Sequence, residues 1–376
     1  MSNRCSSGPN SPQDARPACH PLWERADARG ARNAPTAMAA FRWPSRPVRD
    51  LFVTHFAALR DTCGRLPAAG VAIVAIDETH DRIAGAVCVE ATPTRPNAAI
   101  VGRHSRADLY LPDDPTVALR HLAIIVPPLL SSLDATGIRY RVVDLRTGIG
   151  FGTERDPVLH SITADGPACV RVAGYALFCL PAGEAADWPD DPDAAWERFP
   201  ACRYVTARPL PEGLPAVRRP PRGTPAGRRG SPRDTLVVVG RGPFEARRAD
   251  VLGGGPPVGE LVVEHRGGGR ERLLVGDTAA AAGILLGRYP RCDVDLLRAF
   301  DDESVSRVHL LVVRVGDRMV AIDTASTNGT WPVDADGACG SGDGTPPRVV
   351  DLTPSRTLEL GRGHVAVAWN TDARAA

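Results

Sequence analysis

The sequence predicts an all-β protein with two similar β-sandwich domains, and three observations support this fold class. Short runs of β-type residues alternate with turn residues from residue 70 to about residue 181, and again from residue 235 to residue 369. One ordered set of polar motifs occurs in both stretches. A segment dense in Pro, Gly and Arg separates the two stretches, and this composition is typical of a linker between domains.

The length and composition limit the classes of protein to consider. A chain of 376 residues is long enough for two or three domains, and its formal net charge of +1 provides no general attraction to nucleic acid or membranes. The sequence contains no Lys, which excludes Schiff-base chemistry and a P-loop lysine. Its abundant Arg, Ala, Gly and Pro are typical of a GC-rich bacterial genome. Without a long apolar run or an apolar secretion signal, we expect a cytoplasmic protein with no membrane-spanning helix.

The N-terminal region is expected to divide into an unstructured tail and a short helix. Residues 1–45 are rich in Pro, Arg, Ala and Ser and have no periodicity, so we expect them to be disordered. Translation could begin at Met1 or at Met38. Residues 46–66 are expected to form a helix that packs on the domain that follows, because apolar residues recur on one helical face. These residues are Phe52, Phe56, Leu59, Cys63 and Leu66.

The expected domain boundaries follow the two β-rich stretches. The first sandwich is expected at residues 67–183 and the second at residues 233–372, with a linker at residues 184–232. The expected strands of the first sandwich are 71–76, 86–90, 98–101, 122–126, 140–143 and 170–180. Those of the second are 235–239, 260–264, 272–275, 284–286, 308–315, 319–322, 348–352 and 364–369.

The expected linker contains a local run of basic side chains. Its members are Arg218, Arg219, Arg222, Arg228 and Arg229. A solvated linker is the favoured interpretation, because no aromatic residue is interleaved to stack on nucleic-acid bases. Contact with nucleic acid is kept as an alternative.

The second stretch contains three polar blocks whose order is far more specific than any one block alone. The blocks are Gly287-Arg288, Ser306-Arg307-Val308-His309 and Asn328-Gly329. Over about residues 258–370, the sequence closely resembles the forkhead-associated (FHA) domain, whose signature has these blocks in this order. The resemblance implies a β-sandwich that binds phosphothreonine peptides through loops at one end.

The residue types in these blocks suit a phosphothreonine, which brings a charge of about −2 and strong acceptor oxygens. Arg288 presents a planar fork that can donate to two phosphate oxygens at once. Ser306 and Thr327 offer hydroxyl groups from facing loops, and Arg307 adds a second positive charge. The amide of Asn328 can donate to and accept from a peptide backbone. Hydrogen bonds with a charged partner contribute about 1.5–3 kcal/mol each, so two or three supply most of a micromolar affinity of about 8 kcal/mol.

The resemblance gives the remaining motif residues a structural role. His309 would brace the loop that presents Ser306, and Gly287 would permit the close approach of another backbone segment. Gly329 completes an Asn-Gly turn, a common hairpin connection. A preference for threonine over serine would come from seating one methyl group, which contributes at most about 0.8 kcal/mol through burial.

The first stretch repeats the order of the blocks but has lost most of their polar side chains. Arg103 matches Arg288, and His121 matches His309. The replacements are Ala118 for Ser306, Leu119 for Arg307, Gly148 for Thr327 and Ile149 for Asn328. Alanine and isoleucine side chains cannot hydrogen-bond a phosphate or a peptide, and one surface arginine contributes little by itself. Residues 67–183 are therefore expected to form a degenerate FHA-like domain.

Two roles stay open for this degenerate domain. It could be a structural brace or a dimerisation surface, which is the favoured interpretation. Alternatively, it could bind a partner without phosphate through Leu119, Ile149 and Phe151, provided that these apolar side chains are exposed. Arg120 and Arg146 could compensate for the lost polar groups, but their positions do not match the pattern.

Enzymatic activity is not expected. The sequence contains no P-loop, nucleophile elbow, zinc-protease helix or kinase signature set. The nine Cys residues include no C-x-x-C pair and the His residues are dispersed, so no metal or cofactor is expected. The paired acids Asp113-Asp114 and Asp301-Asp302-Glu303 are expected to be solvated loop residues.

The sequence therefore predicts a phosphothreonine-binding adaptor in bacterial Ser/Thr kinase signalling. The implied partners are a phosphothreonine-containing protein and a Ser/Thr protein kinase or its substrate. A first alternative is a phosphate-independent structural scaffold of a larger assembly, such as a secretion system. A second alternative is a regulator that contacts nucleic acid through the basic linker, which strong salt dependence of binding would reveal.

Overall fold

A computed structural model describes most of the two β-rich stretches. The described residues are 46–66, 70–129, 138–154, 156, 158–182, 188–198, 204–207, 251–253, 256–296, 303–334 and 345–371. The predicted disordered tail, the alternative start at Met38, the basic run from Arg218 to Arg229 and the strand expected at 235–239 lie outside the described residues.

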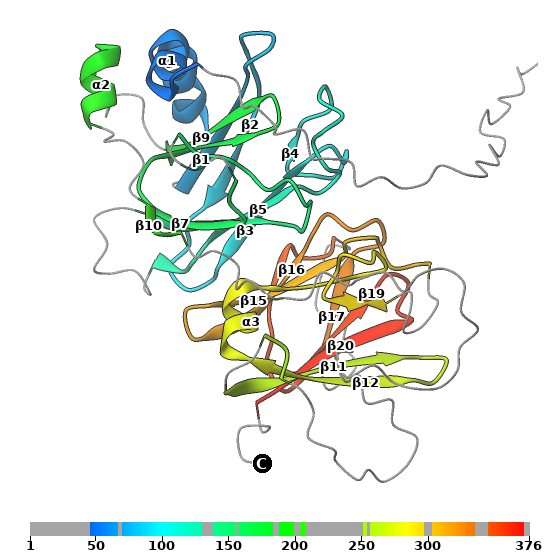
Figure 1. Ribbon diagram of the computed structural model, residues 1–376. Coiled ribbons are helices and arrows are strands. Elements are labelled where there is room, and N and C mark those ends of the chain that lie inside the picture. Colours follow the sequence, from blue (N-terminus) through cyan, green and yellow to red (C-terminus); the bar gives the residue numbers. More distant parts are fainter. Residues whose placement is uncertain are drawn as a thin grey trace, which may run out of the picture. The chain divides into compact units, whose positions relative to one another are not determined.

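The N-terminal stretch forms a sandwich of two sheets (Figure 1). One sheet has the order β2 (Arg82–Glu90), β1 (Gly70–Asp77), β9 (Tyr175–Ala182) and β8 (Ala168–Val172). The other has the order β10 (Tyr204–Ala207), β7 (Ser161–Asp165), β6 (Arg139–Asp144), β5 (Leu122–Val126), β3 (Asn97–Gly102) and β4 (Leu109–Tyr110). Both sheets contribute to one core, in which Ile73 and Leu177 of the first meet Ile124 and Tyr140 of the second.

The C-terminal stretch also forms a sandwich of two sheets (Figure 1). One sheet has the order β12 (Arg270–Gly276), β11 (Pro257–His265), β20 (Val365–Asn370), β19 (Arg356–Leu360) and β17 (Thr330–Asp334). The other has the order β14 (Val294–Asp295), β13 (Ile284–Gly287), β15 (Leu310–Val315), β16 (Arg318–Asp323) and β18 (Val349–Asp351). Their shared core includes Leu261, Trp369, Leu286 and Val312, and helix α3 (Asp277–Ala282) precedes β13.

The two sandwiches repeat one strand topology. The sheet order β7-β6-β5-β3-β4 of the first recurs as β18-β16-β15-β13-β14 in the second. Each copy contains a short parallel strand pair, β3 with β4 and β13 with β14, next to antiparallel neighbours. In both copies, the chain therefore leaves the sheet at an equivalent glycine, Gly102 or Gly287. It then returns as a short strand, β4 or β14, at the same edge of the sheet.

Helix α1 (Val48–Arg65) packs on the N-terminal sandwich, as the apolar periodicity predicts. It buries Phe52, Phe56, Leu59 and Cys63 against residues of β1 and β9. Helix α2 (Pro192–Arg198) joins the same cluster through Trp196, whose ring centroid lies 5.3 Å from that of Phe52. In the described part of the chain, no helix combines the length and apolar character needed to cross a membrane.

Two expectations about elements are wrong. The run expected as a single strand at 170–180 is a hairpin of β8 and β9, because Ala173 takes a left-handed backbone conformation with φ 52° and turns the chain. Alanine rarely adopts this conformation, so the sequence carries no signal for the turn. The segment expected as linker from residue 184 contains α2 and β10, and β10 pairs with β7, so the sandwich extends beyond residue 183. Five further strands were also not expected, namely β4, β7, β14, β17 and β19.

Candidate functional site

The three polar blocks of the C-terminal sandwich meet at one end of the β13–β15–β16 sheet. The first block follows β13, the second precedes β15, and the third connects β16 to β17. The backbone N–H of Arg288 donates to the carbonyl of Ser306 over 3.2 Å. A Cβ atom on Gly287 would lie 2.2 Å from the carbonyl oxygen of Arg307, so only glycine fits between these segments.

His309 ties the second block to the third. Its side chain is 0% exposed, and its Nδ1 accepts a hydrogen bond from the backbone N–H of Ser306 at 3.0 Å. The proton therefore resides on Nε2, which donates to the carbonyl of Gly329 at 3.1 Å. Burial lowers the pKa of His309 despite the nearby carboxylate of Asp323, so the imidazole is neutral near pH 7.

The third block is a turn organised by Asp323. Its carboxylate accepts hydrogen bonds from the Ser326 backbone N–H at 2.7 Å, the Ser326 hydroxyl at 2.6 Å and the Thr330 hydroxyl at 2.7 Å. Two residues of the turn have left-handed backbone angles, Ala325 with φ 63° and Gly329 with φ 81°. Buried hydrogen bonds thus hold a conformation that is unfavourable for alanine.

The five residues expected to bind a phosphopeptide lie on these connected loops. The Ser306 hydroxyl accepts a hydrogen bond from the Thr327 backbone N–H at 2.9 Å, and the Asn328 amide donates to the carbonyl of Ser304 at 2.7 Å. The side chains of Arg307 and Thr327 are exposed. The Nε of Arg288 is buried and finds no hydrogen-bond partner among the described residues.

This unpaired Nε determines what the site can do. A buried N–H group without an acceptor costs about 1–3 kcal/mol, and more when the group is charged. A ligand with acceptor oxygens would remove that cost, and a negative charge on it would favour the guanidinium further. The site is therefore suited to an anionic oxygen-rich group.

The N-terminal sandwich keeps the structural contacts of the three blocks. A Cβ atom on Gly102 would lie 2.4 Å from the carbonyl oxygen of Leu119. His121 accepts from the Ala118 N–H at 3.1 Å and contacts the Gly150 carbonyl through Nε2 at 2.9 Å. Asp144 again anchors the turn, here by accepting from the Thr147 hydroxyl at 2.5 Å.

The polar surface of this copy is different. Ala118 and Ile149 stand where Ser306 and Asn328 stand in the other copy, and Gly148 replaces Thr327. The Nε of Arg103 donates to the carbonyl of Val117 at 3.2 Å, whereas the Nε of Arg288 has no hydrogen-bond partner in the part of the chain that the structure describes.

The alternative of an apolar docking site at this loop end required exposed Leu119, Ile149 and Phe151. Phe151 does not meet this condition, because it is 0% exposed, and the side chains of Leu119 and Ile149 are only partly exposed.

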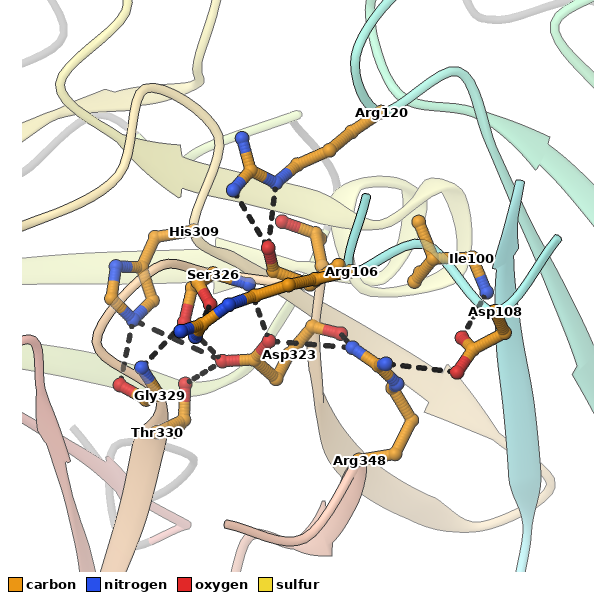
Figure 2. A network of polar contacts seen from close by, with 12 residues as sticks. Ile100, Arg106, Asp108, Arg120, His309, Asp323, Ser326, Gly329, Thr330 and Arg348 are labelled. Carbon is orange, nitrogen blue, oxygen red and sulfur yellow. Dashed lines mark hydrogen bonds and ion pairs between the residues drawn. The ribbon is translucent and has the colours of Figure 1, made fainter. Parts of the chain in front are cut away.

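Several polar residues next to the site were missed by sequence reasoning. Arg120 and Arg146 do not compensate for the lost groups of their own copy, since they donate to Ala325 and Asp293 of the other copy. Arg106, Asp108 and Arg348 lie with Arg120 in the polar network beside the third block (Figure 2). One available signal was Arg120 itself, because a charged residue stands there where the other copy has Val308.

The paired acids expected to be solvated loop residues have different surroundings. Asp114 accepts hydrogen bonds from the Thr116 N–H at 2.8 Å and the Gly174 N–H at 2.9 Å, so it orders its loop. Glu303 is exposed, whereas Asp301 and Asp302 lie outside the described residues. Within the described ranges, no group of three or more His, Cys, Asp or Glu could hold a metal ion.

Residues 284–334 match the family model described as the FHA domain. This part of the chain is an FHA domain. The match runs from β13 to β17 and includes all three polar blocks. FHA domains are binding modules and not enzymes.

Solved structures of FHA proteins are similar to this chain. The FHA-1 domain of Mycobacterium tuberculosis Rv1747 has 24% identity and a TM-score of 0.22, with 30% of this chain and 98% of that chain covered. Mycobacterium tuberculosis EmbR, in complex with a low affinity phosphopeptide, has 18% identity and a TM-score of 0.22, with coverage of 30% and 24%. The FHA domain of Chlamydia trachomatis CT664 has 16% identity and a TM-score of 0.23, with coverage of 29% and 95%. No curated protein matches the chain.

Proposed function

We propose that the FHA domain binds a phosphothreonine segment of a partner protein, and that the chain is an adaptor in bacterial Ser/Thr kinase signalling. The observation that carries this proposal is the buried Nε of Arg288 at the junction of the three polar blocks, which has no hydrogen-bond partner among the described residues. A phosphate oxygen supplies the acceptor that this guanidinium lacks, together with negative charge.

Each of the other expected residues has a role in this proposal. The hydroxyl of Ser306 contacts the loop of Thr327 in the structure, and with the ligand bound it would donate to a second phosphate oxygen instead of to the Thr327 hydroxyl. Arg307 and Thr327 are exposed and can reach the ligand from opposite loops. Asn328, held by Ser304, pairs with the peptide backbone beside the phosphothreonine.

The N-terminal sandwich is proposed to be a second FHA-like domain that keeps the fold without the binding chemistry. The repeated strand order and the matched contacts of Gly102 and His121 support this proposal. The proposed adaptor is cytoplasmic and has no catalytic activity. Its proposed partners are a phosphothreonine-containing protein and a Ser/Thr kinase or a substrate of that kinase.

The proposal is tested by fluorescence polarisation of the full chain with a degenerate phosphothreonine peptide library. Matched unphosphorylated and phosphoserine libraries are the ligand controls. We expect phosphate-dependent binding that Arg288→Ala weakens on the order of 100-fold and Arg103→Ala leaves intact. Equal binding of phosphorylated and unphosphorylated libraries, or no binding of either, would reject the reader and favour a phosphate-independent scaffold. Binding of duplex DNA that weakens steeply with salt would favour the nucleic-acid alternative.

A further inference from the structure

The two sandwiches share a buried apolar interface. They belong to one compact unit, Trp43–Ala376, and the outward faces of their β3–β5–β6 and β13–β15–β16 sheets form a single hydrophobic cluster. The N-terminal side contributes Ile100, Ala107, Ala123, Ile125, Val143 and Leu145. The C-terminal side contributes Leu285, Cys292, Leu311, Val313, Val320, Ile322 and Ala325. Equivalent faces of the repeated fold therefore pack on each other, as in a two-fold dimer within one chain.

Polar contacts around this cluster follow the same approximate symmetry. Arg106 and Arg291 occupy equivalent positions after the Gly-Arg blocks. Arg106 donates to the carbonyls of Ser326, at 3.2 Å, and Thr327. In return, Arg291 donates to the carbonyls of Arg146, at 3.3 Å, and Thr147. Each copy thus holds the third block of the other.

The symmetry is broken at Arg120. Its Nε and Nη2 both donate to the carbonyl of Ala325, at 3.2 and 2.7 Å, and the residue is 7% exposed. The equivalent residue in the FHA domain is Val308, whose side chain cannot donate a hydrogen bond. Of the two turns, within the described residues, that of the FHA domain alone therefore receives this additional pair of hydrogen bonds.

Three guanidinium groups converge on that turn (Figure 2). Arg106 and Arg120 come from the N-terminal sandwich. Arg348 comes from the FHA domain, donates to the Asp323 carbonyl at 3.0 Å, and is itself held by Asp108 of the N-terminal sandwich at 2.9 Å. Carbonyls of the three successive residues 325–327 thus accept hydrogen bonds from the other sandwich.

We propose that Arg106 and Arg120 of the N-terminal sandwich are positioning residues for the phosphopeptide site of the FHA domain. They hold the turn at residues 325–327 so that Thr327 and Asn328 face the ligand. The effect on ligand affinity rests on the proposed phosphothreonine binding, whereas the ordering of the turn does not.

The conformation of the turn explains why it needs such support. Ala325 has a left-handed φ of 63°, which alanine avoids, so the free turn would sample other conformations. The fork of Arg120 fixes the carbonyl of this residue, and Arg106 fixes the next two. The peptide group whose Ser326 carbonyl accepts from Arg106 also carries the Thr327 N–H, which donates to the Ser306 hydroxyl. Preorganising a loop in this way strengthens binding by reducing the entropy lost when the ligand binds.

The test compares variants of the full chain by phosphothreonine-peptide affinity and by amide hydrogen exchange. Arg106→Ala,Arg120→Ala is expected to bind about tenfold more weakly and to exchange the Thr327 and Gly329 amides faster. Arg120→Lys, which keeps the charge without the fork, is expected to lose most of the same affinity. Arg106 is exposed, so Arg106→Ala alone is expected to keep the fold. This variant is expected to show a smaller loss of peptide affinity and a smaller increase in amide exchange than the double variant.

Arg141→Ala is the matched control. Arg141 also crosses the interface, donating to the carbonyls of Ala281 and of Ala282, the latter at 3.1 Å, but at the end of β13 opposite Gly287. Unchanged affinity and exchange in this variant are expected. Wild-type behaviour of the double variant, or an equal loss in Arg141→Ala, would overturn the proposal. If the wild-type chain binds no phosphopeptide, the proposed function fails, and amide exchange alone then decides whether the arginines hold the turn.

Discussion

The two turns that follow β6 and β16 have the same kinds of buried residues but different side chains on their outer surface. Both begin with a buried aspartate, Asp144 or Asp323, whose carboxylate accepts from a hydroxyl three residues later. Both end at a glycine whose carbonyl contacts a buried histidine. The side chains between these anchors are Thr327 and Asn328 in one copy and Gly148 and Ile149 in the other. The comparison teaches that the residues that form this turn are separate from those proposed to bind a ligand.

The energetic cost of substitution explains this separation. Replacing His121 would leave the Ala118 N–H and the Gly150 carbonyl without their buried partner, and each orphaned group costs about 1–3 kcal/mol. Substitution of an exposed side chain typically changes stability by less than about 0.5 kcal/mol. A copy freed from ligand binding can therefore lose its exposed polar groups while it keeps its fold.

The largest expected difference between the two copies is the effect of removing the equivalent arginines Arg288 and Arg103. Arg288→Ala is expected to weaken phosphothreonine-peptide binding on the order of 100-fold, because two charged hydrogen bonds contribute about 3 kcal/mol together. Arg103→Ala is expected to leave the affinity unchanged, since its Nε serves the Val117 carbonyl. Isothermal titration calorimetry of the full-length variants measures both. Equal losses would show that both copies bind.

The equivalent glycines should behave alike, because both serve the fold. Gly102→Ala and Gly287→Ala each place a Cβ less than 2.5 Å from a backbone oxygen, and such overpacking costs about 1–3 kcal/mol of unfolding free energy. Urea denaturation measures this loss. Gly85→Ala is the control, because its Cβ would meet only the end of the Leu109 side chain at 3.2 Å. Destabilisation by one substitution alone would contradict a shared loop structure.

Removing the hydroxyl at Ser306 and adding one at the equivalent Ala118 tests whether this group distinguishes the two copies in peptide binding. Ser306→Ala removes the acceptor of the Thr327 N–H and one proposed ligand contact, so about tenfold weaker peptide binding is expected. Ala118→Ser is expected to change neither binding nor stability measurably. Fluorescence polarisation and thermal denaturation check the pair. A gain of phosphopeptide binding in Ala118→Ser would mean that the N-terminal sandwich lacks only this hydroxyl to bind a phosphopeptide.

The smallest expected effect is an acid-dependent loss of stability shared by both copies. Burial lowers the pKa of His121 and His309, so below about pH 6.5 the unfolded chain binds protons that the folded chain does not. Stability therefore falls as pH drops through this region, by at most about 1.4 kcal/mol per pH unit for each histidine. For Asp114, burial raises the pKa but hydrogen bonds from Thr116 and Gly174 lower it overall, so its contribution is lost only below its ordinary range.

Differential scanning fluorimetry between pH 7.5 and pH 5 checks this prediction. Arg288→Ala is expected to show the same pH dependence as the wild-type chain, since Arg288 forms no hydrogen bond with either imidazole in the described part of the chain. A melting temperature that stays constant over this range would contradict buried neutral histidines.

Much of the fold and of the candidate site could be predicted from local sequence patterns. Alternating β-type runs and turns predict strands, and the spacing of Phe52, Phe56 and Leu59 predicts the helix α1. The ordered blocks around Arg288 and Ser306 predict the FHA domain, and both blocks lie in the residues 284–334 that match the family model. The hairpin at Ala173 could not be predicted, since its turn depends on a rare backbone conformation of an ordinary residue.

By itself, the sequence determined the class of fold, the repeated motif and the contrast between a polar and an apolar set of loops. Only the tertiary structure decided that the apolar outer faces of the two sheets cover each other, because a buried strand has the same apolar composition whatever packs on it. It also decided the role of Arg106 and Arg120. Their acceptors are backbone carbonyls distant in sequence, and every residue has such a carbonyl, so no residue type marks the partner.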